Sequence, residues 1–186
     1  MSTILERDLG GVTRHRITVE QYHRMGSLDF FTLGERIELV EGEIVDMAPI
    51  GSRHAAMVNQ LVEALVTTLA GQTQVSIQGP LRLDALTEVQ PDIMLLRLRA
   101  DFYAEQTPGA ADALLVVEVA DATLRYDLGT KSDLYLRHGI RNYWVVDATT
   151  GGLRRFTADG HGGYAEQAPL KIDGKEWLSA VMETLV

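Results

Sequence analysis

The sequence contains no cysteine, few lysines and no long apolar run. Without cysteine the chain can form neither disulfides nor thiolate metal sites, a composition typical of cytoplasmic proteins. No stretch approaches the roughly 18 to 20 apolar residues that span a membrane, and the N-terminus has no apolar signal core. We therefore expect a cytoplasmic protein without a membrane segment.

Positive charge is also scarce. The chain has 17 basic and 26 acidic residues, and its net charge of -9 counts against broad binding to polyanions, although a local basic groove would still allow nucleic acid to bind. Carboxylate clusters suit hard cations such as magnesium. The lysines are Lys131, Lys171 and Lys175. Lys131 is far from the C-terminus, and it supplies a compact, tunable charge that arginine does not.

Length and composition are those of one globular domain. A chain of 186 residues can bury a sizeable core but is short for two full domains, and its 46% apolar and 23% charged residues are ordinary values. Residues 1–16 show no periodicity, which predicts an N-terminal arm. We therefore expect a single domain over residues 1–186, with the arm at about 1–16.

Apolar periodicity and turn residues predict the secondary structure. An apolar stripe at three- and four-residue steps, with Ser52 as its cap and Gly71 as its stop, predicts a long helix. Glu41-Gly42 lies between two alternating segments and predicts a hairpin, whereas Gly79-Pro80 predicts a bend in one strand or a hairpin corner. The expected elements are a helix over 19–25, hairpin strands over 36–40 and 43–47, a helix over 53–70, strands over 74–78, 81–84, 89–96 and 114–120, a helix over 127–137, strands over 143–147, 153–156 and 164–167, and a helix or strand over 177–185.

This order predicts an α/β fold with a mixed sheet flanked by helices. Its core reads helix, strand, strand, strand, helix, strand. A hairpin precedes this core at the N-terminal end, and a second hairpin follows it at the C-terminal end.

Three ionisable residues interrupt the apolar pattern of this core. Asp92 begins one apolar strand, Glu118 lies near the end of the next, and Lys131 falls on the helix face that should contact the sheet. The two carboxylates, with the backbone carbonyl of Val119, could hold magnesium through oxygen ligands. A nearby ammonium would stabilise charge on an attacked phosphate or help to deprotonate water. The pattern fits a structural ion pair between Lys131 and Glu118 equally well, and spacing does not separate these interpretations.

Several short motifs, in a fixed order, resemble one family over residues 19–156. The motifs are Glu38-Leu39-Val40-Glu41-Gly42-Glu43, Ser52-Arg53-His54, Gln90-Pro91-Asp92, Leu115-Val116-Val117-Glu118-Val119, Asp127 through Lys131 to Leu134-Tyr135, Gly139-Ile140, and Tyr143-Trp144-Val145-Val146-Asp147. Together they resemble the Uma-two family of predicted restriction endonucleases, a branch of the PD-(D/E)XK nuclease superfamily. The resemblance implies a restriction-endonuclease-like fold and magnesium-dependent hydrolysis of DNA, with manganese as a substitute ion.

The resemblance also implies a role for particular residues. Asp92 and Glu118 would be the metal ligands and Lys131 the catalytic lysine. The superfamily commonly places its lysine two residues after the glutamate, where this chain has Ala120, but this family is known for a lysine displaced onto the helix.

Two further residues match family positions. His54 and Glu38 are candidates for lining the cleft or assisting the metal, although a histidine in the first turn of a helix is also a common polar terminus. After Glu118 the family often has a Ser-Pro-Ser-Thr-like turn, whereas this chain has Ala-Asp-Ala-Thr over 120–123. The carboxylate of Asp121 could bind metal, repel phosphate or lie in solvent, and turn aspartates favour solvent.

Three functions follow as hypotheses. The first is a magnesium-dependent endodeoxyribonuclease, which we expect to be a homodimer because cutting both DNA strands needs two active sites. The second is a catalytically inactive protein of the same fold that binds nucleic acid or a protein partner, which the acidic charge and the absence of a DNA-reading element favour. The third is a hydrolase of small phosphoesters. Candidate phosphate contacts are Arg53, Arg97, Arg99, Arg125 and Arg141.

Overall fold

The computed structural model describes residues 13–32 and 34–185. Most of the arm expected at 1–16 lies outside this range, and residues 13–16 are without regular secondary structure. Within the described part, no helix combines the length and the apolar character needed to cross a membrane.

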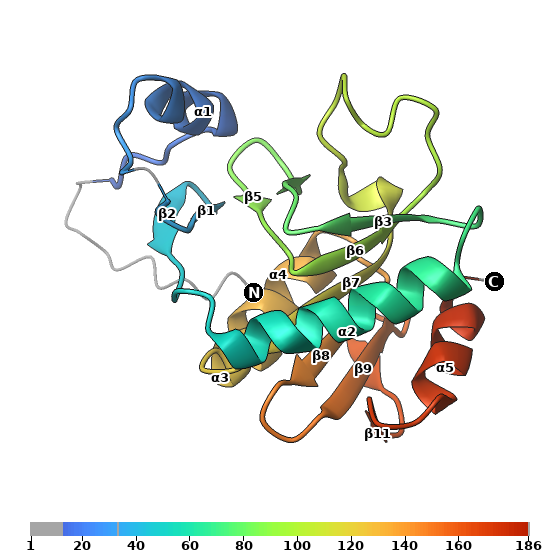
Figure 1. The fold of residues 1–186 in the computed structure, drawn as a ribbon. Coiled ribbons are helices and arrows are strands. Elements are labelled where there is room, and N and C mark those ends of the chain that lie inside the picture. The colour runs from blue at the N-terminus through green and yellow to red at the C-terminus, as the bar shows by residue number, and fades with distance from the viewer. Residues whose placement is uncertain (1–12, 33, 186) are drawn as a thin grey trace.

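A seven-stranded sheet forms the centre of the protein (Figure 1). Its strands follow the order β10-β9-β8-β7-β6-β3, and β11 pairs with β9. The pair β7 and β8 is parallel, and the other pairs are antiparallel, so the mixed sheet expected from the sequence is confirmed. The strands are β3 (Gln74–Ile77), β6 (Ile93–Leu96), β7 (Ala113–Ala120), β8 (Asn142–Asp147), β9 (Gly152–Ala158), β10 (Tyr164–Glu166) and β11 (Leu170–Lys171).

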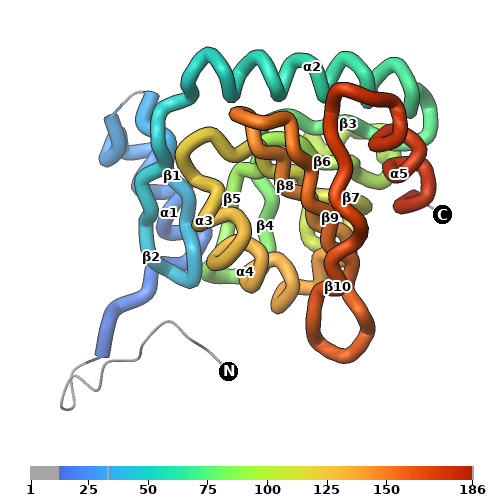
Figure 2. Tube along the Cα trace, turned by 90° about the horizontal axis from the view of Figure 1, so that it is seen from below, coloured from blue at the N-terminus to red at the C-terminus, as the bar shows by residue number. Residues whose placement is uncertain are grey.

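Helices cover both faces of this sheet (Figure 2). On one face, α2 (Ser52–Thr68) and α5 (Glu176–Thr184) pack over a core that includes Val117 and Trp144. On the other face, α4 (Ser132–Arg137) packs over a core that includes Val116. Because successive strand residues point to opposite faces, the apolar run of β7 supplies both cores at once.

A four-stranded antiparallel sheet lies beside the main sheet. Its order is β2-β1-β5-β4, and α1 (Val19–Ser27) begins at the capping box expected from the sequence. The turn at Glu41 and Gly42 has φ values of 50° and 78°, as a two-residue hairpin requires. A Cβ on Gly42 would lie 2.6 Å from the Cβ of Arg16, so a side chain has no room there. The strands are β1 (Ile37–Val40), β2 (Glu43–Asp46), β4 (Leu81–Arg82) and β5 (Glu88–Val89).

The chain passes between the two sheets three times, and two of these crossings, from β3 to β4 and from β5 to β6, were not predicted from the sequence. Residues 89–96 were expected to form one strand, but β5 and β6 belong to different sheets. β3 and β4 are separated in the same way. A proline lies at each of these two crossings, Pro80 between β3 and β4 and Pro91 between β5 and β6. Because proline has no N–H to donate, it interrupts strand pairing at both places.

Two helix predictions also need correction. The helix expected at 127–137 begins earlier, as α3 (Leu124–Tyr126), and continues into α4 through a π-helical turn, η2 (Asp127–Lys131). The helix expected at 53–70 is α2, whose N-cap is Gly51 rather than Ser52. The C-terminal segment, expected as helix or strand, is the helix α5.

Neighbouring residues of α2 allow a direct test of how this helix packs. The side chain of Leu65 is buried against the sheet, whereas Val66 is 51% exposed. Replacing Leu65 with Ala leaves a cavity and should lower the free energy of unfolding by about 2–5 kcal/mol in urea denaturation. Val66→Ala should change it by less than about 0.5 kcal/mol. Equal losses of unfolding free energy in the two variants would contradict the assignment of Leu65 to the buried face of α2.

Candidate active site

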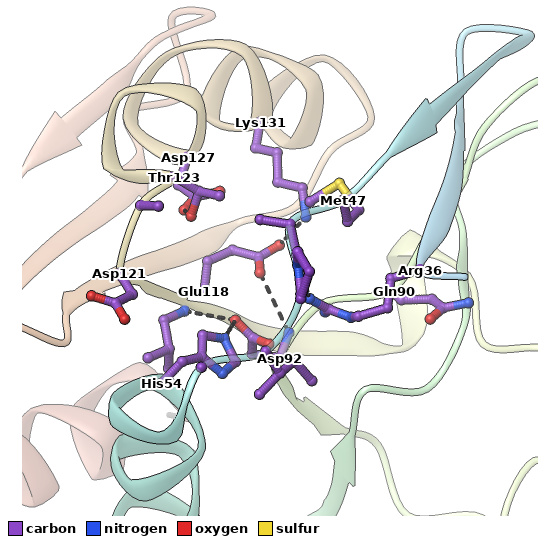
Figure 3. Close-up of a pocket in the computed structure, with 16 residues that line it drawn as sticks. Arg36, Met47, His54, Gln90, Asp92, Glu118, Asp121, Thr123, Asp127 and Lys131 are labelled. Carbon is purple, nitrogen blue, oxygen red and sulfur yellow. Dashed lines mark hydrogen bonds and ion pairs between the residues drawn. The ribbon is translucent and has the colours of Figure 1, made fainter. Parts of the chain in front are cut away.

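The main sheet brings together residues that lie far apart in the sequence. Asp92 directly precedes β6, and Glu118 is the sixth residue of β7. β6 runs antiparallel to β7, with Ile93 opposite Val117. The two carboxylates therefore lie close together, where β6 begins and β7 ends. Both point toward one cavity, which Lys131 enters from the helix on the far side (Figure 3).

Asp92 is held by a set of hydrogen bonds. Its Oδ2 accepts the backbone N–H of Val119 at 2.9 Å and lies 3.0 Å from Nε2 of His54. Its Oδ1 accepts from the side-chain amide of Gln78 at 3.3 Å. Burial alone would raise the pKa of Asp92, but His54, Val119 and Gln78 favour the anion and bring it below the ordinary value.

Lys131 lies between two glutamates. Its Nζ donates to Oε1 of Glu118 at 2.9 Å and to Oε1 of Glu38 at 3.1 Å, and all three side chains are buried. The hydroxyl of Tyr135 also donates to Oε1 of Glu118, at 2.7 Å. Glu38 further accepts the backbone N–H of Gln90 at 2.9 Å, while its Oε2 has no partner in the described part of the chain. One ammonium therefore serves two buried carboxylates.

Because one ammonium serves two carboxylates, the pKa values of both Glu118 and Lys131 are shifted. Burial raises the pKa of Glu118 to about 8, and the charges of Asp92 and Asp127 act in the same direction, against the opposing effect of Lys131. Burial would lower the pKa of Lys131, but Glu118 and Glu38 raise it above its ordinary value. Lys131 is consequently a fixed cation at neutral pH, whereas Glu118 retains a proton that a cation could displace.

The π-helical turn places a third carboxylate at the cavity. Asp127 opens this turn and Lys131 closes it, and both line the cavity. Asp127 accepts a hydrogen bond from the hydroxyl of Thr123, and burial raises the pKa of its carboxyl group. The sequence analysis missed Asp127 as a site residue, although its position four residues before Lys131 places both on one helix face.

The cavity has a volume of about 120 Å³. Of the residues expected from the sequence, Asp92, Glu118, Val119, Lys131 and His54 line it. Glu38 lies behind Lys131 and contacts it without lining the cavity. Further lining residues that the sequence analysis did not identify are Arg36, Met47, Gln90 and Thr123.

The arginines expected to contact phosphate lie in different parts of the structure. Nη1 of Arg53 donates to Oδ1 of Asp121 at 2.9 Å, and Asp121 lines the cavity, so Asp121 is ion-paired as well as exposed. Arg99 pairs with Asp101. Arg97 and Arg141 line a different hollow, near the opposite end of β7.

The donor set can be compared with the needs of a divalent cation. In the described ranges, no group of three or more histidine, cysteine or acidic side chains is arranged as a metal cage. Magnesium does not require one, since it is commonly held by one or two carboxylates and keeps several waters. Asp92 and Glu118 supply two carboxylates, and the unpartnered Oε2 of Glu38 reflects the excess of negative charge beside them. The residues present therefore fit a magnesium ion.

The fold of this chain is similar to that of a protein of known structure. A crystal structure from Anabaena variabilis, described as a "putative nuclease belonging to DUF820", superimposes with a TM-score of 0.61. The two sequences are 13% identical, and the match covers 91% of this chain and 99% of that one. At this identity the likeness concerns the fold. No curated protein matches the chain.

The family is shown by sequence. The family model Uma2, described as "Putative restriction endonuclease", matches residues 19–183. The chain belongs to this family, which confirms the resemblance found in its motifs.

The raised pKa of Glu118 predicts a pH dependence of stability. Between its ordinary value of 4.5 and about 8, the folded state holds a proton that the unfolded state has lost. Raising the pH through this window should therefore lower the free energy of unfolding of the metal-free protein, by no more than about 1.4 kcal/mol per pH unit. Glu118→Gln removes this titration. The stability of the variant relative to the wild type should rise with pH in urea denaturation, and a constant difference would contradict the assignment.

Proposed function

We propose that this protein is a magnesium-dependent endonuclease that hydrolyses phosphodiester bonds of DNA. The observation that carries the proposal is the meeting of Asp92, Glu118 and Lys131 in one cavity at the edge of the sheet. Membership of a family described as restriction endonucleases, together with a nuclease-like fold, supports it.

Asp92 and Glu118 are the proposed magnesium ligands, with the backbone carbonyl of Val119 as a third oxygen. The N–H of Val119 donates to Asp92, and because a strand residue directs its N–H and C=O to the same side, the carbonyl faces the side on which Asp92 lies. When bound, the ion would supply Lewis-acid polarisation of the phosphate and would lower the pKa of water. Manganese, which also prefers oxygen ligands, would substitute for it.

Lys131 acts in this proposal as an electrostatic stabiliser rather than a base. Its raised pKa keeps it protonated at neutral pH, so it has no free lone pair with which to accept a proton. Two of its three N–H groups are occupied by Glu118 and Glu38. The third has no partner among residues 13–32 and 34–185, and in this proposal it donates to an oxygen of the scissile phosphate, where negative charge develops in the transition state.

His54 and Glu38 act through their neighbours. His54 holds the carboxylate of Asp92 from the first turn of α2, and Glu38 holds Lys131 from β1. We assign both as positioning residues. Because the carboxylate of Asp92 can only accept, Nε2 of His54 carries the proton in this contact, while the buried Nδ1 has no partner in the described part of the chain.

The first test is cleavage of plasmid DNA with magnesium and with a chelator. Asp92→Asn, Glu118→Gln and Lys131→Met should each reduce the cleavage rate by roughly 100-fold or more, because each removes a charge that acts in the transition state. Chelation should abolish cleavage, and manganese should restore it.

Matched variants control for changes in charge alone. The matched variants are Asp133→Asn and Lys171→Met. Asp133 is an exposed residue of α4, and Lys171 is an exposed residue of β11. Both should cleave at the wild-type rate. Cleavage that persists in all three site variants would assign the activity to a contaminant and reject the proposal.

A non-catalytic role is the alternative, and the enclosure of Lys131 favours it. This side chain is 1% exposed and is paired in the free protein, so a substrate has little access to it. Calorimetry with magnesium, with and without a DNA duplex, separates the two functions. An enzyme should take up magnesium through Asp92 and Glu118, and Asp92→Asn should weaken the binding. DNA binding without any magnesium uptake would establish the alternative.

Double-strand cleavage adds an expectation about assembly. Two active sites are needed to cut both strands, and a homodimer would supply them. Analytical ultracentrifugation with and without DNA measures the oligomeric state, and conversion of plasmid to nicked circles alone would indicate a single acting site.

A further inference from the structure

A second concave site lies at the other end of the main sheet. This hollow has a volume of about 440 Å³, within the range of sites that bind small molecules. It opens where β7 and β8 begin, whereas Glu118 lies near the end of β7. With a rise of roughly 3.3 Å per strand residue, Ala113 at its edge is about 16 Å from Glu118 along the strand. The hollow is therefore separate from the proposed catalytic cavity.

Three arginines line this hollow, in a protein of net charge -9. They are Arg97, Arg141 and Arg155. In residues 13–32 and 34–185, six arginines form ion pairs with carboxylates within 4.0 Å, whereas these three, like Arg16, Arg24, Arg36 and Arg125, form none. Their positive charge is thus directed into the hollow without an acidic neighbour in contact.

Two of the guanidinium groups are fixed in place. Nε of Arg97 donates to the carbonyl of Ala111 at 3.1 Å. Nη2 of Arg155 donates to the carbonyl of Ala168 at 2.9 Å, and the guanidinium carbon lies 5.9 Å from the centre of the Trp144 ring. Each guanidinium carries five N–H donors, so both groups keep donors for a ligand.

One of these donors is already removed from water. Nε of Arg155 is buried and has no hydrogen-bond partner in the described part of the chain. A buried donor without an acceptor costs free energy, and an acceptor brought by a ligand would recover it. Asn142, Thr157 and Gln167 add polar groups to the same wall.

The neighbouring helix end does not account for this much positive charge. The C-terminal end of α5 lies at the hollow and carries a partial charge of about -0.5, to which Glu183 adds a full negative charge. Against three guanidinium groups, about half of the positive charge remains unbalanced among the lining residues.

We propose that this hollow binds a phosphate group of a nucleotide-sized ligand, held by Arg97, Arg141 and Arg155. The planar fork of N–H donors on each guanidinium matches the oxygens of a phosphate, and the volume accommodates a base and sugar beside it. The phosphate comes either from a free nucleotide or from the end of a nucleic-acid strand. This site does not depend on the proposed nuclease activity.

The test is NMR titration of the metal-free, ¹⁵N-labelled protein at constant ionic strength. The ligands are inorganic phosphate, adenosine monophosphate, and a short single-stranded oligonucleotide with or without a 5′-phosphate. Phosphate and the nucleotide should produce saturable shifts at the amides of Asn142 and Thr157, and leave those of His54 and Asp92 unmoved.

Single arginine variants identify the ligand contacts. Arg141→Gln should weaken binding by roughly tenfold, the effect of one charge-assisted hydrogen bond. Arg155→Lys keeps the charge but loses the fork, and should weaken binding while the melting temperature stays near that of the wild type. Arg24→Gln is the control, since Arg24 is an exposed arginine on α1 outside the hollow.

The results of these experiments distinguish a phosphate site from its absence, and a strand end from a free nucleotide. Weaker binding in Arg141→Gln but not in Arg24→Gln supports the site. Tighter binding of the 5′-phosphorylated oligonucleotide than of the nucleotide assigns a strand end as the source, and the reverse order assigns a free nucleotide. The absence of saturable shifts up to about 10 mM phosphate, or equal binding by wild type and Arg141→Gln, would overturn the proposal.

Discussion

The rest of the site depends on one buried ammonium. Lys131 joins the helix behind the cleft to β7 of the main sheet through Glu118 and to β1 of the second sheet through Glu38. Removing one member of such a cluster leaves a buried charge unpaired, which typically costs about 3–5 kcal/mol. The contact that orients the proposed catalytic lysine is therefore also a contact that holds the two sheets together.

Asp92 and Glu118 have different surroundings, and their pKa values are shifted in opposite directions. Asp92 receives an amide N–H, a histidine and a glutamine, and its pKa falls. Glu118 accepts hydrogen bonds from Lys131, from the Tyr135 hydroxyl and, at 3.4 Å, from the backbone N–H of Asp92, but it lies deeper in the core, and its pKa rises. Two acids a few ångströms apart are thus prepared for different charge states, the arrangement by which enzymes divide roles between like groups. A dication would bring both to the ionised state.

Much of this could be predicted from the sequence because the signals were local. The apolar run 114–120 interrupted by Glu118, the alternation about Glu41-Gly42 and the stripe of α2 each reflect a period set by backbone geometry. The crossings at Pro80 and Pro91 were missed because a strand pattern does not reveal which sheet the strand joins. The pairing of Glu38 with Lys131 spans 93 residues, and no local pattern encodes it. Asp127 was overlooked although it lies four residues before Lys131, because that spacing is common on helices and does not show that a side chain lines a cavity.

That turn has a consequence for how the site could change in evolution. A π-helical turn holds one residue more than an α-helical turn spanning the same stretch. Deleting a single residue between Asp127 and Lys131 would convert the wide turn into a regular α-helical turn, so the helical segments on either side would keep their relative orientation. Lys131 and Tyr135 would keep their spacing, since the segment that joins them begins where the wide turn ends. The wide turn could therefore be lost or acquired by the change of one codon, while the ion cluster beside it stays intact.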